Sequence, residues 1–192
     1  MYYLLDRSWA FYPARVDDAF SYDRQGVWWN DGRLFTKPLK TPIEMKLEPY
    51  VPGSPDQSPR MPAMFKGKIP MFRDDLLEAF HAGGADNFQI FPARILDPDT
   101  GQAHENYKAV NILGMVAAAD MTNSIWSAPD GIPLVDVAFE KLVIDPNKTR
   151  SLLLFRLAEN HAAIMVHERL RDHLVNSGFS ELEFHKPEQA AL

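Results

Sequence analysis

One stretch of the sequence resembles a catalytic metal motif. Residues 167–171 read His-Glu-Arg-Leu-Arg, whereas zinc proteases use His-Glu-x-x-His, in which two histidines four residues apart on a helix bind one metal ion beside a general base. Arg171 stands at the second histidine position, and His173 lies six residues after His167, about 600° around a helix. The two rings therefore lie on different faces. We expect no zinc site here and interpret His167 as the residue that begins a helix.

A pair of acidic residues resembles the start of a calcium loop, which needs oxygen ligands at alternate positions. Asp97 and Asp99 have the right spacing, but Gly101 comes one position too early. Lys108 stands at the twelfth position, where such a loop needs a bidentate glutamate. The pattern therefore favours a β-turn over a cation site.

The sequence lacks the other common signatures of catalysis. Its six histidines are scattered, and it has no nucleophile elbow, phosphate-binding loop or dinucleotide fingerprint. The absence of cysteine excludes cysteine nucleophiles, thiolate zinc sites and disulfides. We therefore predict no enzyme, no catalytic residue, no metal and no cofactor. A small hydrolase whose Asp/His site is dispersed along the sequence stays open as an alternative.

Two adjacent tryptophans are the most informative surface signal. Trp28 and Trp29 lie in a segment, residues 26–35, whose apolar runs flank an Asn-Asp-Gly turn and predict a β-hairpin. Adjacent residues of a strand point to opposite faces, so both tryptophans do not face the same core. An exposed tryptophan beside Asp31 suits an interface anchor. The alternative is that another part of the chain covers it.

Charge is unevenly distributed along the chain. The net charge is −6, with 12 basic and 12 acidic residues in 1–96 but 8 basic and 14 acidic residues in 97–192. An acidic half disfavours nucleic acid, because nucleic-acid binding depends on neutralising phosphates. It favours a basic protein partner, for which Asp97, Asp99 and Glu105 are candidate contacts. The basic stretch 33–73 leaves a nucleic-acid or peptide adaptor open as an alternative.

The expected elements indicate an α+β protein with a mostly antiparallel sheet and a few helices. Residues 72–82 and 167–177 have the periodicity of amphipathic helices, and a glycine follows each of them. Strands are predicted at residues 2–5, 88–96, 107–113, 135–144, 152–157, 162–166 and 182–184.

Proline is concentrated in one segment, since eight of the 15 prolines fall between Pro38 and Pro70. Proline removes backbone donors, so residues 37–70 are expected to be extended, with at most an edge strand near residues 47–51. The segment is rich in apolar residues and poor in glycine and serine. We therefore expect an ordered wrap across the domain rather than a free linker.

This change in character suggests two parts. We predict a lighter N-terminal lobe, residues 1–85, which includes the wrap, and a better-defined C-terminal α+β domain, residues 86–192; one integrated domain is the alternative. The N-terminus has no basic segment before an apolar run, and the longest apolar run, residues 112–119, is too short to span a membrane. We expect a soluble, cytoplasmic protein with no membrane partner.

The C-terminal half contains short runs whose order and spacing are distinctive. They read Phe-Gln-Ile-Phe-Pro-Ala at 88–93, Tyr107 with Val-Asn-Ile-Leu at 110–113, Ala119-Asp120 with Ser124, Leu-Phe-Arg-Leu at 154–157, Val-His-Glu-Arg-Leu at 166–170, and Gly178-Phe179 leading to Phe184. The Tyr-Tyr-Leu-Leu start fits the same pattern. Together these runs resemble a bacterial immunity-protein family from polymorphic toxin systems, over roughly residues 86–185.

The resemblance implies an α+β protein that binds a cognate toxin and neutralises it by occluding it, with no catalytic residues of its own. It also implies structural roles for Asp120, Ser124, Phe155 and Arg156, and we expect Arg156 and Asp120 to form a buried ion pair. An acidic inhibitor suits a basic toxin cleft. The predicted toxin contacts are Trp28, Trp29, Asp31, Asp97, Asp99 and Glu105.

Overall fold

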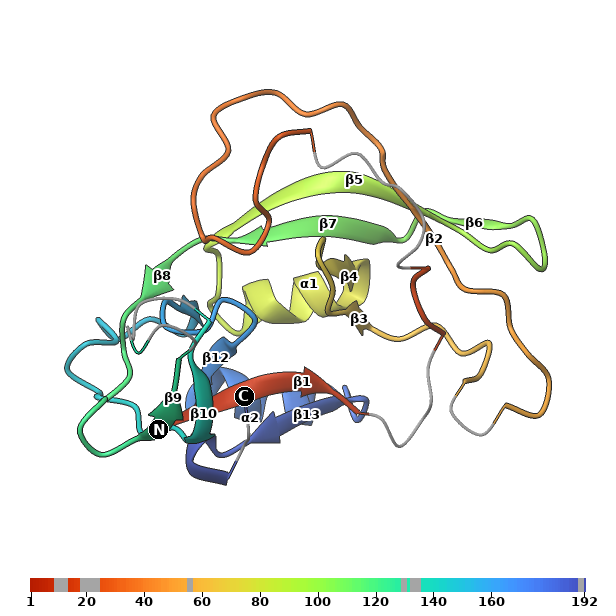
Figure 1. Ribbon diagram of the computed structural model, residues 1–192. Coiled ribbons are helices and arrows are strands. Elements are labelled where there is room, and N and C mark those ends of the chain that lie inside the picture. The colour runs from red at the N-terminus through yellow and green to blue at the C-terminus, as the bar shows by residue number, and fades with distance from the viewer. Residues whose placement is uncertain (9–13, 18–24, 55–56, 129–130, 132–135, 190–191) are drawn as a thin grey trace.

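A computed structural model describes residues 1–8, 14–17, 25–54, 57–128, 131, 136–189 and 192 of the chain. In these residues strands predominate, joined by two α-helices and one short 3-10 helix (Figure 1). The strands form a six-stranded, a five-stranded and a two-stranded sheet. The predicted α+β class is confirmed.

The six-stranded sheet is built around one long antiparallel hairpin. In it β5 (Phe88–Leu96) pairs with β7 (Tyr107–Ile112), from Phe88 opposite Ile112 to Pro92 opposite Lys108. Strand β2 (Ile43–Lys46) runs parallel to β5 on its other edge. The sheet is completed by β4 (Met71–Arg73) and β3 (Met64–Phe65) beyond β7, and by β6 (Ala103–His104) at the end of β5.

The five-stranded sheet joins the two ends of the chain. Strand β1 (Tyr2–Arg7) lies between β13 (Leu182–His185) and β12 (Ile164–His167), antiparallel to both. Beyond β12 come β11 (Leu154–Leu157) and the short parallel strand β8 (Met115–Val116). Strands β9 (Ile125–Ser127) and β10 (Ala138–Lys141) form the separate two-stranded sheet, and the 3-10 helix η1 covers Pro187–Gln189.

Helix α1 (Asp74–Ala82) lies between the two large sheets (Figure 1). Its buried face includes Leu76 and Phe80, and it shares one core cluster with Val110 of β7, Leu5 of β1 and Leu170 of α2 (Glu168–Asn176). Two acidic residues in its first turn lie at the positive end of the helix dipole. The helix thus fills the space between the sheets with the apolar face that its sequence predicts.

The proline-rich segment supplies β2 and β3 to the six-stranded sheet and helps to fill the core on the face opposite α1. Its apolar residues Ile43, Met45, Phe65 and Ile69 are buried in a second core cluster. The buried Tyr107 hydroxyl donates a 2.5 Å hydrogen bond to the carbonyl of Pro62, which ties the segment to β7. Burial raises the pKa of Tyr107 to about 12, so the hydroxyl keeps its proton at neutral pH. These contacts are those of a packed wrap.

Most predicted elements lie where the sequence places them. The helices at residues 72–82 and 167–177 and the strand at residues 88–96 are confirmed within two residues at each end. The strand predicted at 135–144 is shorter, and residue 135 lies outside the described residues. The edge strand predicted near residues 47–51 is β2, four residues earlier, and Leu47 only bridges to Val16.

The hairpin predicted at residues 26–35 is wrong. This segment forms turns and irregular loop instead. The Gln89 side chain hydrogen-bonds to the backbone N–H and carbonyl of Phe35, and the Asn111 side chain to the carbonyl of Arg33. In a hairpin these backbone groups would have paired with a neighbouring strand. Side-chain partners therefore replaced the expected cross-strand pairing.

Strands from both sides of residue 85 share each large sheet. In the five-stranded sheet β1 pairs with β12 and β13, and in the six-stranded sheet β4 pairs with β7. The division into a lobe at residues 1–85 and a domain at residues 86–192 stays a prediction.

We expect Tyr107→Phe to lower the free energy of unfolding by about 1–3 kcal/mol, because it leaves the buried carbonyl of Pro62 without its donor. Urea denaturation measures the change. Tyr50→Phe is the matched control, since Tyr50 is only half-buried and its hydroxyl makes no hydrogen bond within the described part of the chain. Equal stability of Tyr107→Phe and the control would show that this bond does not hold the wrap.

Candidate partner-binding surface

The two tryptophans have opposite environments, on a loop formed by residues 28–35 that we name the Trp28 loop. The side chain of Trp28 is 69% exposed, whereas that of Trp29 is 2% exposed. The Trp29 ring meets Phe35 at 5.1 Å and Phe91 at 5.5 Å, edge to face in both cases. The expectation that one tryptophan is exposed is therefore confirmed, although the segment is not a strand.

The Trp28 loop is fixed to the six-stranded sheet along its length. The amide of Gln89 bonds both backbone groups of Phe35, at 2.6 and 3.1 Å, and Asn111 Nδ2 donates to the carbonyl of Arg33 at 2.7 Å. Gly32 has a φ of +66°, and a Cβ there would lie 3.0 Å from the backbone of Gly114. Only glycine fits this close approach without strain. The loop is therefore held in one conformation by the sheet beneath it.

The exposed tip of the Trp28 loop combines apolar and charged side chains. Leu34, six residues after Trp28 on the same loop, is 61% exposed. Between them the side chain of Arg33 is 86% exposed and approaches the Asp31 carboxylate at 4.0 Å. A large aromatic anchor with an aliphatic neighbour and charges around them is the composition of a binding hot spot. Leu34 was not among the predicted contacts, because nothing in the expected hairpin indicated that its side chain would be exposed.

Arg156 lies beneath this region and is 2% exposed. Its Nη1 donates to the carbonyl of His161 at 2.8 Å, while its Nε has no hydrogen-bond partner among the described residues. Burial lowers the pKa of Arg156 to about 10, and the negative charge of Asp31 acts in the opposite direction. The backbone N–H of Arg156 donates to Gly114, the residue that contacts Gly32. The buried cation therefore lies under the anchor of the Trp28 loop.

The predicted ion pair between Arg156 and Asp120 is wrong. The Asp120 carboxylate accepts instead from the Asn123 side chain at 2.6 Å and from the N–H of Thr122 at 3.1 Å, and these bonds lower the pKa of Asp120. Arg156 points to the same face of β11 as Leu154, which belongs to the core cluster around α1. Asp120 follows Ala119, which belongs to a third core cluster on the opposite face of β11, together with Phe155. The alternation of β11 therefore points the arginine away from this aspartate.

Ser124 and Phe155 make local packing contacts. The Ser124 hydroxyl accepts from the N–H of Val143 at 2.9 Å and so closes the turn that Asp120 begins. Phe155 is fully buried and meets the Tyr2 ring at 5.4 Å. Structural roles for Asp120, Ser124, Phe155 and Arg156 stay predictions.

The acidic candidates lie at the far end of β5. Asp97 follows the last residue of β5, whereas the Trp28 loop contacts Gln89 near its first, so about 25 Å of strand separates them. Asp97 Oδ1 accepts the N–H groups of Asp99 and Thr100, and Asp99 Oδ2 accepts the N–H of Tyr50 at 2.6 Å. Glu105 is exposed and 3.9 Å from Arg94. The structure therefore does not bring these residues together with Trp28 and Asp31.

The bonds around Asp97 form the predicted β-turn. Although desolvation works against it, hydrogen bonds from Asp99 and Thr100 lower the pKa of Asp97. No group of three or more histidine, aspartate or glutamate side chains among the described residues has the arrangement of a metal site. The hydrogen bonds of the turn account for the spacing of Asp97 and Asp99.

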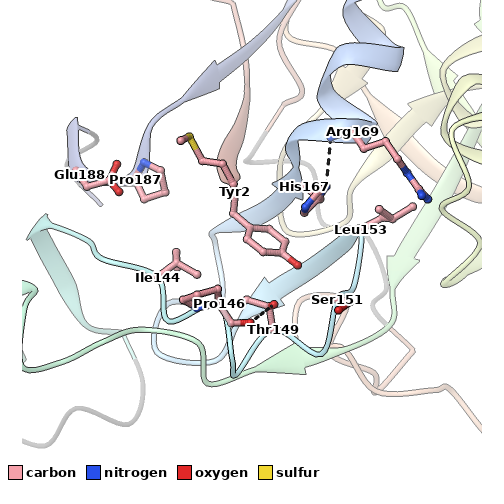
Figure 2. Close-up of a pocket in the computed structure, with 11 residues that line it drawn as sticks. Tyr2, Ile144, Pro146, Thr149, Ser151, Leu153, His167, Arg169, Pro187 and Glu188 are labelled. Carbon is pink, nitrogen blue, oxygen red and sulfur yellow. Dashed lines mark hydrogen bonds between the residues drawn. The ribbon is translucent and has the colours of Figure 1, made fainter.

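A cavity of about 640 Å³ lies between β1, β12, η1 and the segment of residues 144–153 (Figure 2). His167 and Tyr2 lie together in its wall, with their rings edge to face at 5.1 Å. His167 Nδ1 accepts the N–H of Arg169, so the ring caps α2, as predicted for a residue that begins a helix. Thr149 Oγ1 donates to the carbonyl of Pro146 at 2.8 Å. No hydrogen bond within the described residues joins a hydroxyl of this cavity to His167.

We expect Trp29→Ala to lower the free energy of unfolding by about 3–5 kcal/mol, because it removes a buried aromatic side chain. Trp28→Ala is the matched variant and is expected to change stability by less than about 0.5 kcal/mol, since the side chain is mostly in water. Urea denaturation compares the two. Equal losses of stability would mean that Trp28 is covered and unavailable to a partner.

The His167 cap predicts a dependence of stability on pH. Burial lowers the pKa of His167, the N-terminal ammonium and Arg169 act in the same direction, and Glu168 opposes them. Because the unfolded chain binds the proton more tightly, stability is full above the unfolded pKa of about 6.5 and falls as pH decreases towards the lower folded pKa. His167→Asn keeps a capping oxygen that does not titrate. Thermal unfolding between pH 8 and 5 should show a smaller decrease for His167→Asn, and parallel curves would contradict this role.

The chain is similar to one known protein family. A family model described as "Immunity protein family (Imm11)" matches residues 18–189, most of the chain. The match includes the proline-rich segment and so extends further than the resemblance seen at residues 86–185. No curated protein matches the chain. Within the described residues, no helix has the length and apolar character to cross a membrane. The chain belongs to the Imm11 immunity protein family.

Proposed function

We propose that this protein binds a cognate bacterial toxin in the cytoplasm and neutralises it by covering the surface that the toxin needs. Membership of an immunity protein family supports a toxin as the partner. The observation that carries the mode of action is the Trp28 loop, which presents an exposed tryptophan and an exposed leucine on a backbone fixed by the sheet. Inhibition then needs no chemistry from the protein itself.

The fixed backbone favours binding by preformed contact. Ordering a flexible loop on binding costs free energy for each residue that becomes immobile. Here the loop is already ordered when the protein folds, because Gln89 and Asn111 bond to its backbone and Gly32 packs against Gly114. Trp28 and Leu34 can therefore contribute their burial to affinity directly.

The acidic residues Asp97, Asp99 and Glu105 add a second part to the proposal. Asp97 and Asp99 lie on the turn after β5, and Glu105 lies between β6 and β7. Negative charge there attracts basic groups of a toxin and speeds the encounter. Asp97 and Asp99 are held by turn hydrogen bonds, so their charges have fixed positions. We assign them to orientation of the partner rather than to the anchor.

The test is co-expression with the product of any toxin-like reading frame adjacent to the gene. The intact protein is expected to restore growth and to co-purify with the toxin in a one-to-one complex. Restored growth without a complex would overturn occlusion and indicate an enzyme that reverses the damage. Failure to restore growth would overturn the immunity role for that toxin.

The anchor is tested separately with Trp28→Gln/Leu34→Gln. Loss of both apolar side chains is expected to weaken the complex by about thirtyfold or more, since a hot spot contributes about 2 kcal/mol or more to binding. Val175→Gln is the matched control, because Val175 is also an exposed aliphatic residue, on α2 and away from the loop. Isothermal titration calorimetry measures both. Equal affinity of the two variants would exclude the Trp28 loop as the anchor.

A further inference from the structure

A second cavity, of about 310 Å³, opens where the end of β1 meets the six-stranded sheet. Both edge strands of that sheet contribute to its lining, Met45 from β2 and Phe65 from β3. The sheet therefore curls far enough to bring its two edges to one pocket. We name this cavity the basic pocket, because four cationic side chains line it, Arg7, Arg15, Lys66 and Lys68.

The base of the basic pocket is apolar and its rim is charged. Met45, Phe65 and Ile69 are each at most 2% exposed. Lys66 Nζ lies 3.1 Å from Asp6 Oδ2 and 3.4 Å from the carbonyl of Leu5, which fixes the ammonium at the rim. Lys68 is exposed. The pocket thus combines a hydrophobic base with positive charges at its opening.

The charge of this pocket opposes that of the chain as a whole. The protein carries a net charge of −6, yet among the described residues four basic residues and one acidic residue, Glu48, line the pocket, with Asp6 beside Lys66. Arg7 and Arg15 have other partners as well. A guanidinium has five N–H donors, so one partner does not exhaust it. Positive potential in a concave site attracts anions and repels basic groups.

We propose that the basic pocket binds an acidic segment of the partner toxin, with its carboxylates at the lysine and arginine rim and an apolar side chain on the base. This rests on the proposed function and specifies the chemistry of the partner. Strands and connecting turns bound the pocket, whereas proteins commonly hold free phosphate at a helix N-terminus or a nest of backbone N–H groups. An apolar base suits a side chain better than a bare anion.

The pocket lies close to the acidic turn after β5. The chain runs from Met45 and Glu48, which line the pocket, to Tyr50, whose N–H is bound by Asp99. A positive and a negative site therefore lie a few residues apart on one segment. Two adjacent sites of opposite sign fix the orientation of a partner more strictly than one, because a reversed partner meets like charges. The toxin then carries a basic group and an acidic segment side by side.

Charge reversal in the complex tests the proposal. Lys68→Glu is expected to weaken toxin binding by about tenfold and to reduce the association rate, most strongly at low salt. Lys186→Glu makes the same change at an exposed lysine outside the pocket and is expected to change affinity by less than about twofold. If the wild-type protein binds the toxin and both variants bind it with equal affinity, the proposed contact with an acidic segment is overturned. The immunity role would remain intact. No binding by the wild-type protein would instead overturn the proposed function.

A second measurement needs no toxin. Titration of the ¹⁵N-labelled protein with a hexaglutamate peptide is expected to shift the amide signals of Gly67 and Lys68 saturably, with loss of the effect in Lys68→Glu. Inorganic phosphate at the same ionic strength is expected to leave them in place. Tighter binding of phosphate than of the peptide would assign the pocket to a free anion and overturn the proposal. The absence of any shift with the peptide would also overturn it.

Discussion

The pairing of β5 with β7 is the constraint on which the rest of the structure depends. Because side chains alternate along a strand, this hairpin presents two different faces. One face carries Val110 and Ile112 towards α1, and the other carries Ala109 and Ile95 towards the proline-rich wrap. The parallel addition of β2 to β5 then requires a long crossover, and the crossover holds β3, β4 and α1. One antiparallel pair thus decides which side of the sheet each later segment covers.

The buried charge of Arg156 follows from strand geometry rather than from a partner. Strand β11 is bonded on both edges, to β12 and to β8, so its register is fixed, and Arg156 points to the same face as Leu154. The cost of burying the guanidinium is offset by the carbonyl of His161 and by the negative charge of Asp31. Asp31 therefore interacts electrostatically with two cations, the exposed Arg33 on the Trp28 loop and the buried Arg156 below it.

Local patterns predicted the elements that are long and regular. The strand at residues 88–96 and both helices follow from alternation, helical periodicity and terminal glycines, and these signals are contained within each segment. The two-residue strands β3, β6 and β8 were missed, because their pairing depends on distant partners and not on their own residues. The Trp28 loop was assigned the wrong structure for the same reason, since the amides of Gln89 and Asn111 replace a strand partner. The sequence indicated that one of the two tryptophans is exposed, but it could not indicate that Arg7 and Lys66 lie together, because only the tertiary fold places them at one pocket.

In the Trp28 loop, the residues that anchor the backbone are different from the residues that are exposed. Trp29, Gly32 and the backbone at Arg33 hold the loop, whereas Trp28 and Leu34 project from it. A substitution at an exposed position alters the contact with a partner and leaves the packing beneath it intact. A substitution at an anchoring position costs stability before it affects recognition. The sheet therefore allows the chemistry of the loop to vary at little cost to the fold, which is what the proposed recognition of one toxin among similar ones requires.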